Sequence, residues 1–314
     1  MIIKNDEPLW CEKYRPQTVA DTILPKALKA TFQSYVDEGF IPNITLTGGP
    51  GVGKTTAAMA ALTELGAEYY FINSSMKGNI DTLRTDLAEF ASSVSFTGGR
   101  KYILMDEADY LNAQSTQPAL RGFIEMFSRN CGFILTCNFP SRLLEAILSR
   151  CPVIDFAIPA EEKIDLATQF FMRMQEILER EKVEYDEAEI AAVLEYNFPD
   201  WRKMINILQN STKNKKITTD ISIVSDDDIK KLFRLLKEQD FTKTREWCAE
   251  HGNSHPADLF KVMYGFSNEF MSPMGQAQLA LTISKYEYNA AFVANQEINL
   301  VAAMVEMMTE CEWK

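Results

Sequence analysis

The sequence has no apolar run of the roughly 20 residues that a membrane-spanning helix needs. Its opening, MIIKNDEPLW, also lacks the continuous apolar stretch of a secretory signal peptide. Hydrophobic residues make up 46% of the chain and charged residues 24%, which is ordinary for a soluble globular protein. These absences predict a cytoplasmic protein with no part in a membrane.

Paired cysteines are missing as well. None of the six cysteines belongs to a C-x-x-C pair, so the sequence lacks the usual signature of a zinc module. In a reducing cytoplasm we expect all of them to remain thiols, as small buried hydrophobic side chains. The six are Cys11, Cys131, Cys137, Cys151, Cys248 and Cys311.

Basic residues are the minority among the charged ones. The chain has 32 Lys and Arg against 44 Asp and Glu, which gives a formal net charge of -12. A uniformly acidic surface repels phosphates, so this balance argues against broad, nonspecific binding of nucleic acid. Any contact with DNA must therefore come from a local basic face.

Residues from about 40 to 157 alternate between short apolar or β-branched runs and helical stretches. Such an alternation predicts a parallel sheet that is covered on both faces. The expected strands are Ile44–Thr47, Tyr69–Asn73, Tyr102–Asp106, Phe133–Asn138 and Val153–Phe156. The expected helices are Thr55–Leu65, which ends at Gly66, and then Ile80–Ser92, Gln117–Arg129 and Leu143–Leu148.

After Pro159 the pattern becomes helical throughout. Helices are expected at Glu161–Arg180, Asp186–Tyr196 and Trp201–Asn210, and helical spacing continues from Ile229 to the end. The length of 314 residues favours more than one domain. We expect an α/β domain at 1–158, a small helical domain at 159–225 and an all-α domain at 226–314.

A phosphate-binding loop follows the first expected strand. The pattern G-x4-G-K-[ST] is met by Gly48, Gly53, Lys54 and Thr55, between a strand and a helix, as this motif requires. Glycines let backbone N–H groups curl around phosphate oxygens, and the helix N-terminus adds partial positive charge. Lys54 is expected to reach the β- and γ-phosphates, and Thr55 to offer its hydroxyl to Mg²⁺. The loop predicts a protein that binds ATP with Mg²⁺.

Two adjacent acids end the third expected strand. Asp106 at such a strand end faces the phosphate loop and is expected to bind Mg²⁺, largely through water. Glu107 is expected to act as the general base that polarises the attacking water. Asn138, at the tip of the next strand, could orient that water or touch the γ-phosphate, or it could be an ordinary polar strand end.

With these residues in place, the sequence resembles the AAA+ family and, within it, the sliding-clamp-loader ATPases, most closely the large subunits of T-even-like bacteriophages. Residues 10–16 (WCEKYRP) are similar to the W-x-E-K-Y-R-P opening of clamp-loader subunits, which in that family lies against the adenine base. Residues 149–151 match the family's S-R-C motif, and residues 198–203 (FPDWRK) look like the phage form of the sensor-2 helix. The ending EWK at 312–314 is also similar to the phage ending. In that family the three expected domains are an AAA+ ATPase domain, a lid and a collar.

The resemblance implies a role for individual residues. Asn138 becomes sensor 1, Arg202 contacts the γ-phosphate from the lid, and Arg150 becomes an arginine finger for a neighbouring subunit. From the sequence alone, an arginine such as Arg150 is more often a surface salt-bridge partner, and only the match to the S-R-C motif makes it catalytic. The catalytic set is then Glu107, Lys54, Asn138, Arg150 and Arg202, with Thr55 and Asp106 as metal ligands. The residues expected to bind the nucleotide are Trp10, Tyr14, Arg15, Pro16, Gly48, Gly49, Pro50, Gly51, Val52, Gly53, Lys54, Thr55, Thr56, Asp106 and Arg202.

The resemblance also implies partners. They are a sliding clamp, primed template DNA bound without regard to sequence, other copies of this chain with a distinct small subunit in a pentamer, and indirectly a DNA polymerase. Arg84, on the expected helix Ile80–Ser92, matches a family arginine that contacts a DNA phosphate, and Lys77 lies just before that helix as a second candidate. Ordinary solvated charges explain both residues as well. A phage origin would place the protein in the host cytoplasm. The alternatives are another DNA-acting AAA+ motor, such as a branch-migration helicase, and a non-hydrolysing scaffold subunit, which would usually lack Lys54, Glu107 or Arg150.

Overall fold

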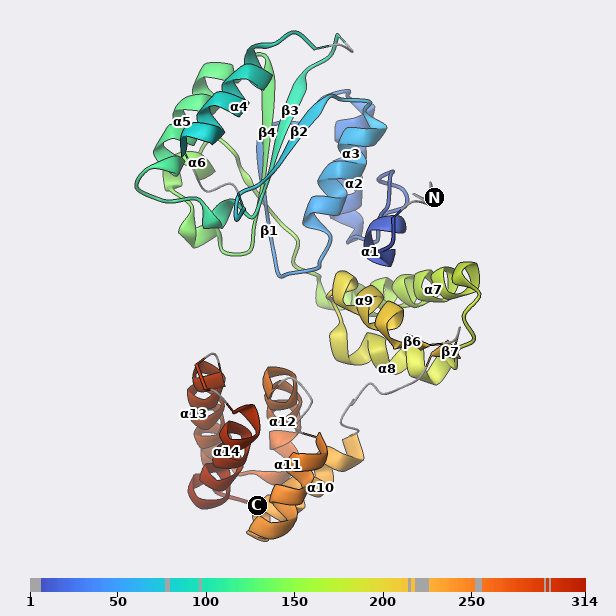
Figure 1. Ribbon diagram of the computed structural model, residues 1–314, viewed down its shortest axis with the longest axis vertical. Coiled ribbons are helices and arrows are strands. Elements are labelled where there is room, and N and C mark those ends of the chain that lie inside the picture. The colour runs from blue at the N-terminus through green and yellow to red at the C-terminus, as the bar shows by residue number, and fades with distance from the viewer. Residues whose placement is uncertain are drawn as a thin grey trace. The chain divides into compact units, whose positions relative to one another are not determined.

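The computed structural model describes residues 7–76, 80–95, 98–213, 216–217, 226–251, 256–290, 292–293 and 295–314. The chain divides into two compact units, residues 1–218 and residues 219–314. The first unit holds an α/β domain and a helical lid, and the second unit is built from helices (Figure 1). The part of the chain that the structure describes contains no helix long and apolar enough to cross a membrane.

The centre of the first unit is a five-stranded parallel sheet with the strand order β2-β3-β4-β1-β5. β2, β3 and β4 follow each other as in the chain, while β1 lies between β4 and β5, and because neighbouring strands are parallel each needs a crossover connection. All five expected strands are present, with ends shifted by no more than two residues. They are β1 (Ile44–Thr47), β2 (Tyr69–Asn73), β3 (Lys101–Asp106), β4 (Cys131–Cys137) and β5 (Val153–Asp155).

Helices cover both faces of this sheet, as Figure 1 shows. On one face, α2 (Lys26–Asp37) and α3 (Lys54–Glu64) pack against Leu104 and Ile134. On the other, α4 (Ile80–Ser92), α5 (Thr116–Phe127) and α6 (Glu145–Leu148) pack against Ile103 and Leu135. Successive residues of a strand point to opposite faces, so a strand that is apolar throughout contributes to both cores.

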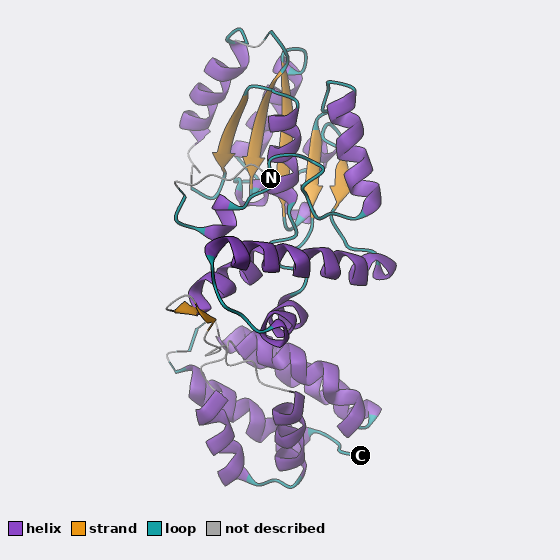
Figure 2. Cartoon of the chain, turned by 90° about the vertical axis from the view of Figure 1, so that its right-hand side faces the viewer, coloured by secondary structure: helices purple, strands orange, loops and turns teal. Residues whose placement is uncertain are grey.

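The lid follows the sheet in the same unit and is seen from the side in Figure 2. It consists of α7 (Lys163–Glu181), α8 (Glu187–Asn197), α9 (Trp201–Ser211) and a short antiparallel pair, β6 (Thr212–Lys213) with β7 (Lys216–Ile217). Asp186 forms a capping box at the start of α8, and Asp200 caps α9 by accepting the backbone N–H of Lys203. The predicted lid helices are therefore present, and the strand pair is an addition to them.

The second unit contains α10 (Asp226–Lys237), α11 (Phe241–His251), α12 (Pro256–Phe270), α13 (Pro273–Ala290) and α14 (Gln296–Glu310). Their apolar faces share one core around Phe233, Phe260 and Met304, each fully buried. The chain end joins this core, because Trp313 forms an isolated bridge with Met271 and its ring meets that of Phe233. The expected all-α character of this region is confirmed, and the described residues of 226–314 include no strand pair suited to a winged helix.

Two further helices precede the sheet, α1 (Trp10–Lys13) and α2. The sequence pattern predicted neither, because it was interpreted as α/β only from about residue 40. α1 packs on α9 of the lid, and α2 packs on α3. The N-terminal residues are thus part of the first unit's structure and lie close to the phosphate-binding loop.

Candidate functional site

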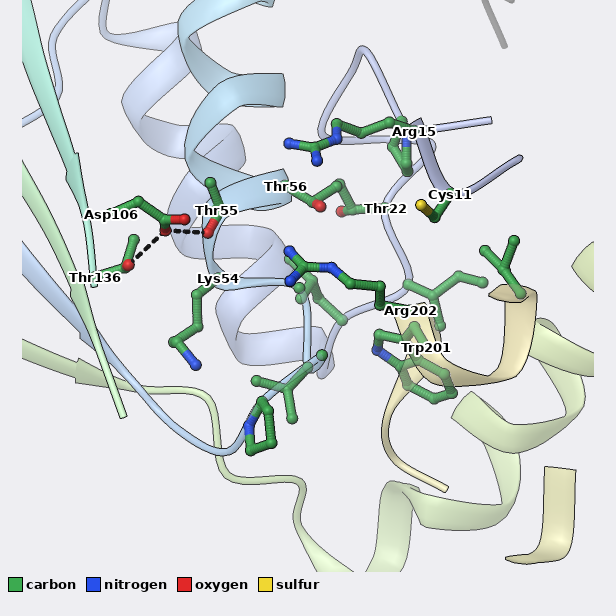
Figure 3. A pocket seen from close by; sticks show the side chains of 18 of the residues that line it. Cys11, Arg15, Thr22, Lys54, Thr55, Thr56, Asp106, Thr136, Trp201 and Arg202 are labelled. Carbon is green, nitrogen blue, oxygen red and sulfur yellow. Dashed lines mark hydrogen bonds between the residues drawn. The ribbon is translucent and has the colours of Figure 1, made fainter. Parts of the chain in front are cut away.

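A pocket opens between the phosphate-binding loop, the ends of β3 and β4, the N-terminal segment and the lid (Figure 3). The sheet contributes Asp106, Glu107 and Asn138, and the loop contributes residues 50–56. Tyr14, Arg15 and Pro16 line another side of it, and Arg202 reaches in from the lid. The fold therefore brings most of the predicted nucleotide-site residues together from positions up to nearly 190 residues apart in the sequence.

The phosphate loop has the backbone that its glycines predict. Gly51 and Gly53 have φ values of 70° and 97°, in the left-handed region that favours glycine, and Gly53 is the N-cap of α3. The ammonium of Lys54 donates hydrogen bonds to the carbonyls of Gly48 (2.8 Å) and Gly49 (2.7 Å) and to Oδ1 of Asn138 (2.8 Å). All three of its N–H groups therefore meet oxygen atoms beside the loop. Gly48 and Gly49 contribute these carbonyls and are not among the described residues that line the pocket.

Burial away from water lowers the pKa of Lys54. The negative charges of Asp106 and Asp109 oppose this effect, and the positive charge of Arg202 adds to it. The side chain is 8% exposed, so its charge acts in a medium less polar than water. The position suits an ammonium that interacts with anionic oxygen atoms.

The two acids at the end of β3 occupy different environments. Oδ1 of Asp106 accepts hydrogen bonds from the hydroxyls of Thr55 (2.5 Å) and Thr136 (2.7 Å), which Figure 3 draws as dashed lines. Glu107 has a φ of 56°, and its backbone N–H donates to the hydroxyl of Thr136 (3.1 Å). A residue other than glycine in this region is uncommon and is often held at a functional site. The pair Thr55 and Asp106 supplies the hard oxygen ligands that Mg²⁺ prefers.

A third acid holds the end of β4. Asp109 is 6% exposed, and its Oδ2 accepts the backbone N–H groups of Asn138 (3.3 Å) and Phe139 (3.2 Å). These bonds fix the backbone at Asn138, whose side chain contacts Lys54. Asn138 is therefore tied to the phosphate loop through its side chain and to the β3 end through its backbone.

The N-terminal segment differs in part from expectation. Tyr14, Arg15 and Pro16, which were predicted to bind the nucleotide, line the pocket, and Cys11, which was not predicted, lines it as well. Trp10 is not among the described residues that line it, although the resemblance had implied contact with the base. It is 8% exposed, its backbone N–H donates to Oε1 of Gln209 on α9, and its helix α1 packs on α9 of the lid.

The lid touches the phosphate loop directly. The backbone N–H of Trp201 donates to the carbonyl of Gly51 (3.2 Å), and a Cβ at Gly51 would lie 1.8 Å from Oδ1 of Asp200. Arg202, one residue further along α9, projects into the pocket (Figure 3). The sensor-2 position is thus next to the loop.

Arg150 lies outside the set of residues described as lining this pocket. Its guanidinium forms a salt bridge with Glu125 on α5 and donates to the carbonyl of Ala146. This position fits both expectations for Arg150, a surface salt bridge or a group that acts on another copy. Of the predicted DNA contacts, Lys77 lies outside the described residues, and Arg84 lies on α4 at a position whose side chain is not described.

Several residues that the sequence argument missed take part in the site. Thr136 links both acids, while Thr22, Phe170, Arg173 and Trp201 also line the pocket. Thr136 could have been found, because pairing β3 with β4 in register sets it beside Asp106. Trp201 belongs to the FPDWRK stretch at 198–203, whereas Phe170 and Arg173 carry no sequence signal, since their place depends on how the lid packs.

Comparisons with known proteins agree with this geometry. Residues 44–157 match the family described as "ATPase family associated with various cellular activities (AAA)", and residues 162–225 match "Sliding-clamp-loader large subunit, AAA+ ATPase lid domain". The chain is 32% identical to the sliding-clamp-loader large subunit of Enterobacteria phage T4, over 100% of both chains. It belongs to the sliding-clamp-loader family of AAA+ ATPases.

Other relatives fit this family. The chain is 33% identical to the sliding-clamp-loader large subunit of Escherichia phage RB69, over 99% of both chains. It is also 32% identical to the replication factor C small subunit of Sulfurisphaera tokodaii, over 96% of both. As an AAA+ clamp-loader family member, the chain is a nucleotide-binding ATPase, as predicted.

Among solved structures, a mutant of Thermotoga maritima RuvB aligns with a TM-score of 0.53 at 17% identity, over 76% of this chain and 86% of that one. At this identity the likeness concerns the fold alone. The predicted fold class is confirmed: a P-loop domain with a parallel sheet, a helical lid and a helical C-terminal region.

Proposed function

We propose that this protein is the ATPase subunit of a sliding-clamp loader, which uses ATP binding and hydrolysis to open a ring-shaped clamp and load it onto primed template DNA during replication. The observation that carries the proposal is the identity of 32–33% to sliding-clamp-loader large subunits along essentially the whole chain. The pocket supports it, because its residues suit ATP hydrolysis. A phage origin, in line with these relatives, would make the host cytoplasm its site of action.

The donor set fits ATP with Mg²⁺. Lys54 would meet the β- and γ-phosphate oxygens, which are a better match for its ammonium than the loop carbonyls that it contacts here. Thr55 and Asp106 would hold Mg²⁺ together with phosphate oxygens and water, since Mg²⁺ usually keeps several waters and takes one or two protein ligands. Such an ion neutralises charge on the transferring phosphoryl group. Consistent with this, the described residues include no cluster of three or more acids, histidines or cysteines suited to a metal held by protein alone.

The remaining groups would divide the catalytic work. Glu107 would accept a proton from the attacking water as the general base. Asn138, tied to Lys54, would serve as sensor 1, and Arg202 would contact the γ-phosphate from the lid. Each of these contacts helps hydrolysis only if it is stronger with the transition state than with ATP.

Arg150 would act on the ATP of a neighbouring copy. Its separation from its own pocket supports this role, and so does the cationic charge that an arginine finger brings to the transferring phosphoryl group. We infer that the working assembly contains several copies of this chain, together with a distinct small subunit in a pentamer. A DNA polymerase would take part indirectly, through the loaded clamp.

DNA would be held by a few cations on the inner side of the ring. Arg84 on α4 and Lys77 before it are our candidates, and contacts of this kind to phosphates depend on salt and not on base sequence. Repetition in several copies would compensate for the net charge of -12. The acidic remainder of the surface would then limit stray binding.

The proposal is tested by measuring ATP hydrolysis with and without primed DNA and the cognate clamp. Strong stimulation that requires both partners is expected for a clamp loader. Stimulation by DNA alone, accompanied by strand separation, would instead indicate a branch-migration helicase. Turnover at the background level under every condition, in an intact assembly, would indicate a scaffold subunit.

A further inference from the structure

The N-terminal segment is joined to the lid by a set of hydrogen bonds that we call the N-terminal latch. On one side of it, Lys13 and Tyr14 both donate to Glu181, the last residue of α7. On the other, the side-chain amide of Gln209 on α9 contacts the backbone of Pro8 and Trp10. These bonds cross between residues that lie more than 160 positions apart in the sequence.

The Glu181 side of the latch is the stronger one. Nζ of Lys13 and the hydroxyl of Tyr14 each lie 2.6 Å from the same oxygen, Oε1 of Glu181. Hydrogen bonds to a charged group are about twice as strong as neutral ones, and this ion pair is only about one-fifth exposed on each side. Burial works to raise the pKa of Glu181, but the bonds from Lys13 and Tyr14 outweigh it and hold that pKa below its usual value. The carboxylate is therefore charged near neutral pH.

The Gln209 side fixes the backbone of the segment. Its amide nitrogen donates to the carbonyl of Pro8 (2.7 Å), and its amide oxygen accepts the N–H of Trp10 (2.9 Å). Because Gln209 uses both ends of its amide, the segment has a single register on α9. The same helix carries Arg202 into the pocket.

The latched segment is also a wall of the nucleotide pocket. Cys11, Tyr14, Arg15 and Pro16 line the pocket, directly after or within the latched residues. Further along the chain the segment attaches to α3, where the N–H of Val19 donates to Glu64 (2.8 Å). One strap of chain therefore runs from the phosphate-loop helix to the lid, and its middle part borders the pocket.

We propose that Glu181 is a positioning residue that sets the base-side wall of the pocket, so that base recognition depends on the lid. This inference rests on the proposed binding of ATP. It assigns to Glu181 no contact with the nucleotide: the carboxylate acts through Tyr14 and Lys13. This wall can bind the base only while the hydrogen bonds of the latch are formed. The apparent affinity for ATP therefore falls as the fraction of molecules with a formed latch falls.

Two parts of ATP would be held by different parts of the pocket. The wall formed by Tyr14 to Pro16 would affect the base and ribose, whereas Lys54 and the loop would hold the triphosphate. Loss of the latch should therefore weaken the binding of ATP and leave the binding of inorganic tripolyphosphate unchanged. A general loss of lid structure would affect both, because Arg202 also comes from the lid.

The test measures dissociation constants for MgATP and for magnesium tripolyphosphate by calorimetry, on the full chain. Glu181→Leu should raise the dissociation constant for MgATP about tenfold, equivalent to about 1.4 kcal/mol. The dissociation constant for magnesium tripolyphosphate should change less than twofold. Glu181→Gln should have a smaller effect, because its amide oxygen still accepts from Tyr14 but no longer pairs with the charge of Lys13. Glu179→Gln is the matched control, since Glu179 is exposed on the same helix and outside the latch.

A double-mutant cycle with Tyr14→Phe, which removes only the hydroxyl, completes the design. The two changes should be less than additive, since both remove the same hydrogen bond. Equal losses for both ligands, unchanged MgATP affinity in Glu181→Leu, or strict additivity would each overturn the inference. If the unmodified protein binds tripolyphosphate as tightly as ATP, the proposed ATP site itself fails, which is a separate result.

Discussion

Thr136 offers the most direct test of how the two acids are held. Its hydroxyl donates to Oδ1 of Asp106 (2.7 Å) and accepts the backbone N–H of Glu107 (3.1 Å), and the residue is 2% exposed. Replacement by Val keeps the branched shape and removes the hydroxyl. Asp106 then loses one donor, and the N–H of Glu107 loses its acceptor. Glu107 has an uncommon backbone conformation, so it depends on such support.

The size of the effect follows from these two bonds. A hydrogen bond to a charged group contributes about 1.5–3 kcal/mol and a neutral one about 0.5–1.5 kcal/mol. Thr136→Val should therefore lower the free energy of unfolding of this unit by about 2–4 kcal/mol. If about half of that energy keeps Glu107 in its productive orientation, the kcat for ATP hydrolysis falls about 5- to 30-fold. Nucleotide affinity should change little, because Lys54 and the loop are untouched.

The assay is steady-state ATP hydrolysis at saturating ATP, with nucleotide affinity and unfolding by denaturant measured on the same protein. Thr45→Val is the matched control: Thr45 is fully buried on the adjacent β1, and its hydroxyl donates to the carbonyl of Cys151 (3.0 Å), away from the acids. It should lower stability without lowering kcat. A normal kcat in Thr136→Val, or an equal loss in Thr45→Val, would refute the reasoning.

Three further substitutions have defined outcomes. Glu107→Gln should bind ATP normally and lose nearly all turnover, because the amide cannot accept the proton; normal steady-state hydrolysis would exclude Glu107 as the base. Arg150→Ala should bind ATP normally at its own site, and in mixed assemblies the loss of hydrolysis should appear at the site facing the variant copy; a loss confined to the variant's own site would contradict action in trans. Asp186→Ala removes the capping box of α8 and should destabilise the lid by about 1 kcal/mol in denaturant unfolding, with kcat preserved; an unchanged midpoint would show that the cap contributes nothing.

The sheet and its site could be predicted because their signals are local. A strand buried on both faces must be apolar along its length, and a phosphate loop needs glycine, lysine and a hydroxyl at fixed spacing. For this reason β1 and β2 match the sequence analysis residue for residue. Likewise, α3 ends beside Gly66, whose φ of 64° suits a residue just past a helix end.

The rest of the site depends on contacts that no local pattern encodes. The bonds of Tyr14 to Glu181 and of Trp10 to Gln209 span 167 and 199 residues, and Glu181 is otherwise an ordinary polar residue at a helix end. The resemblance implied that Trp10 would meet the base, whereas its backbone N–H binds Gln209 of the lid, and the residue is buried and is not among those described as lining the pocket. A motif shows that a segment belongs near a ligand, but packing decides which of its side chains reach that ligand.

The proposed role of Arg150 would make hydrolysis depend on assembly. In its own chain the guanidinium is one-third exposed and paired with Glu125, which is half exposed. Such a surface pair contributes about 0–1 kcal/mol, so a neighbouring triphosphate can take over the guanidinium at little cost. Under the proposal, one copy supplies the groups that bind nucleotide, while the arginine finger for its own ATP belongs to the next copy. We therefore expect isolated chains to bind ATP and hydrolyse it slowly, and turnover to rise when copies assemble.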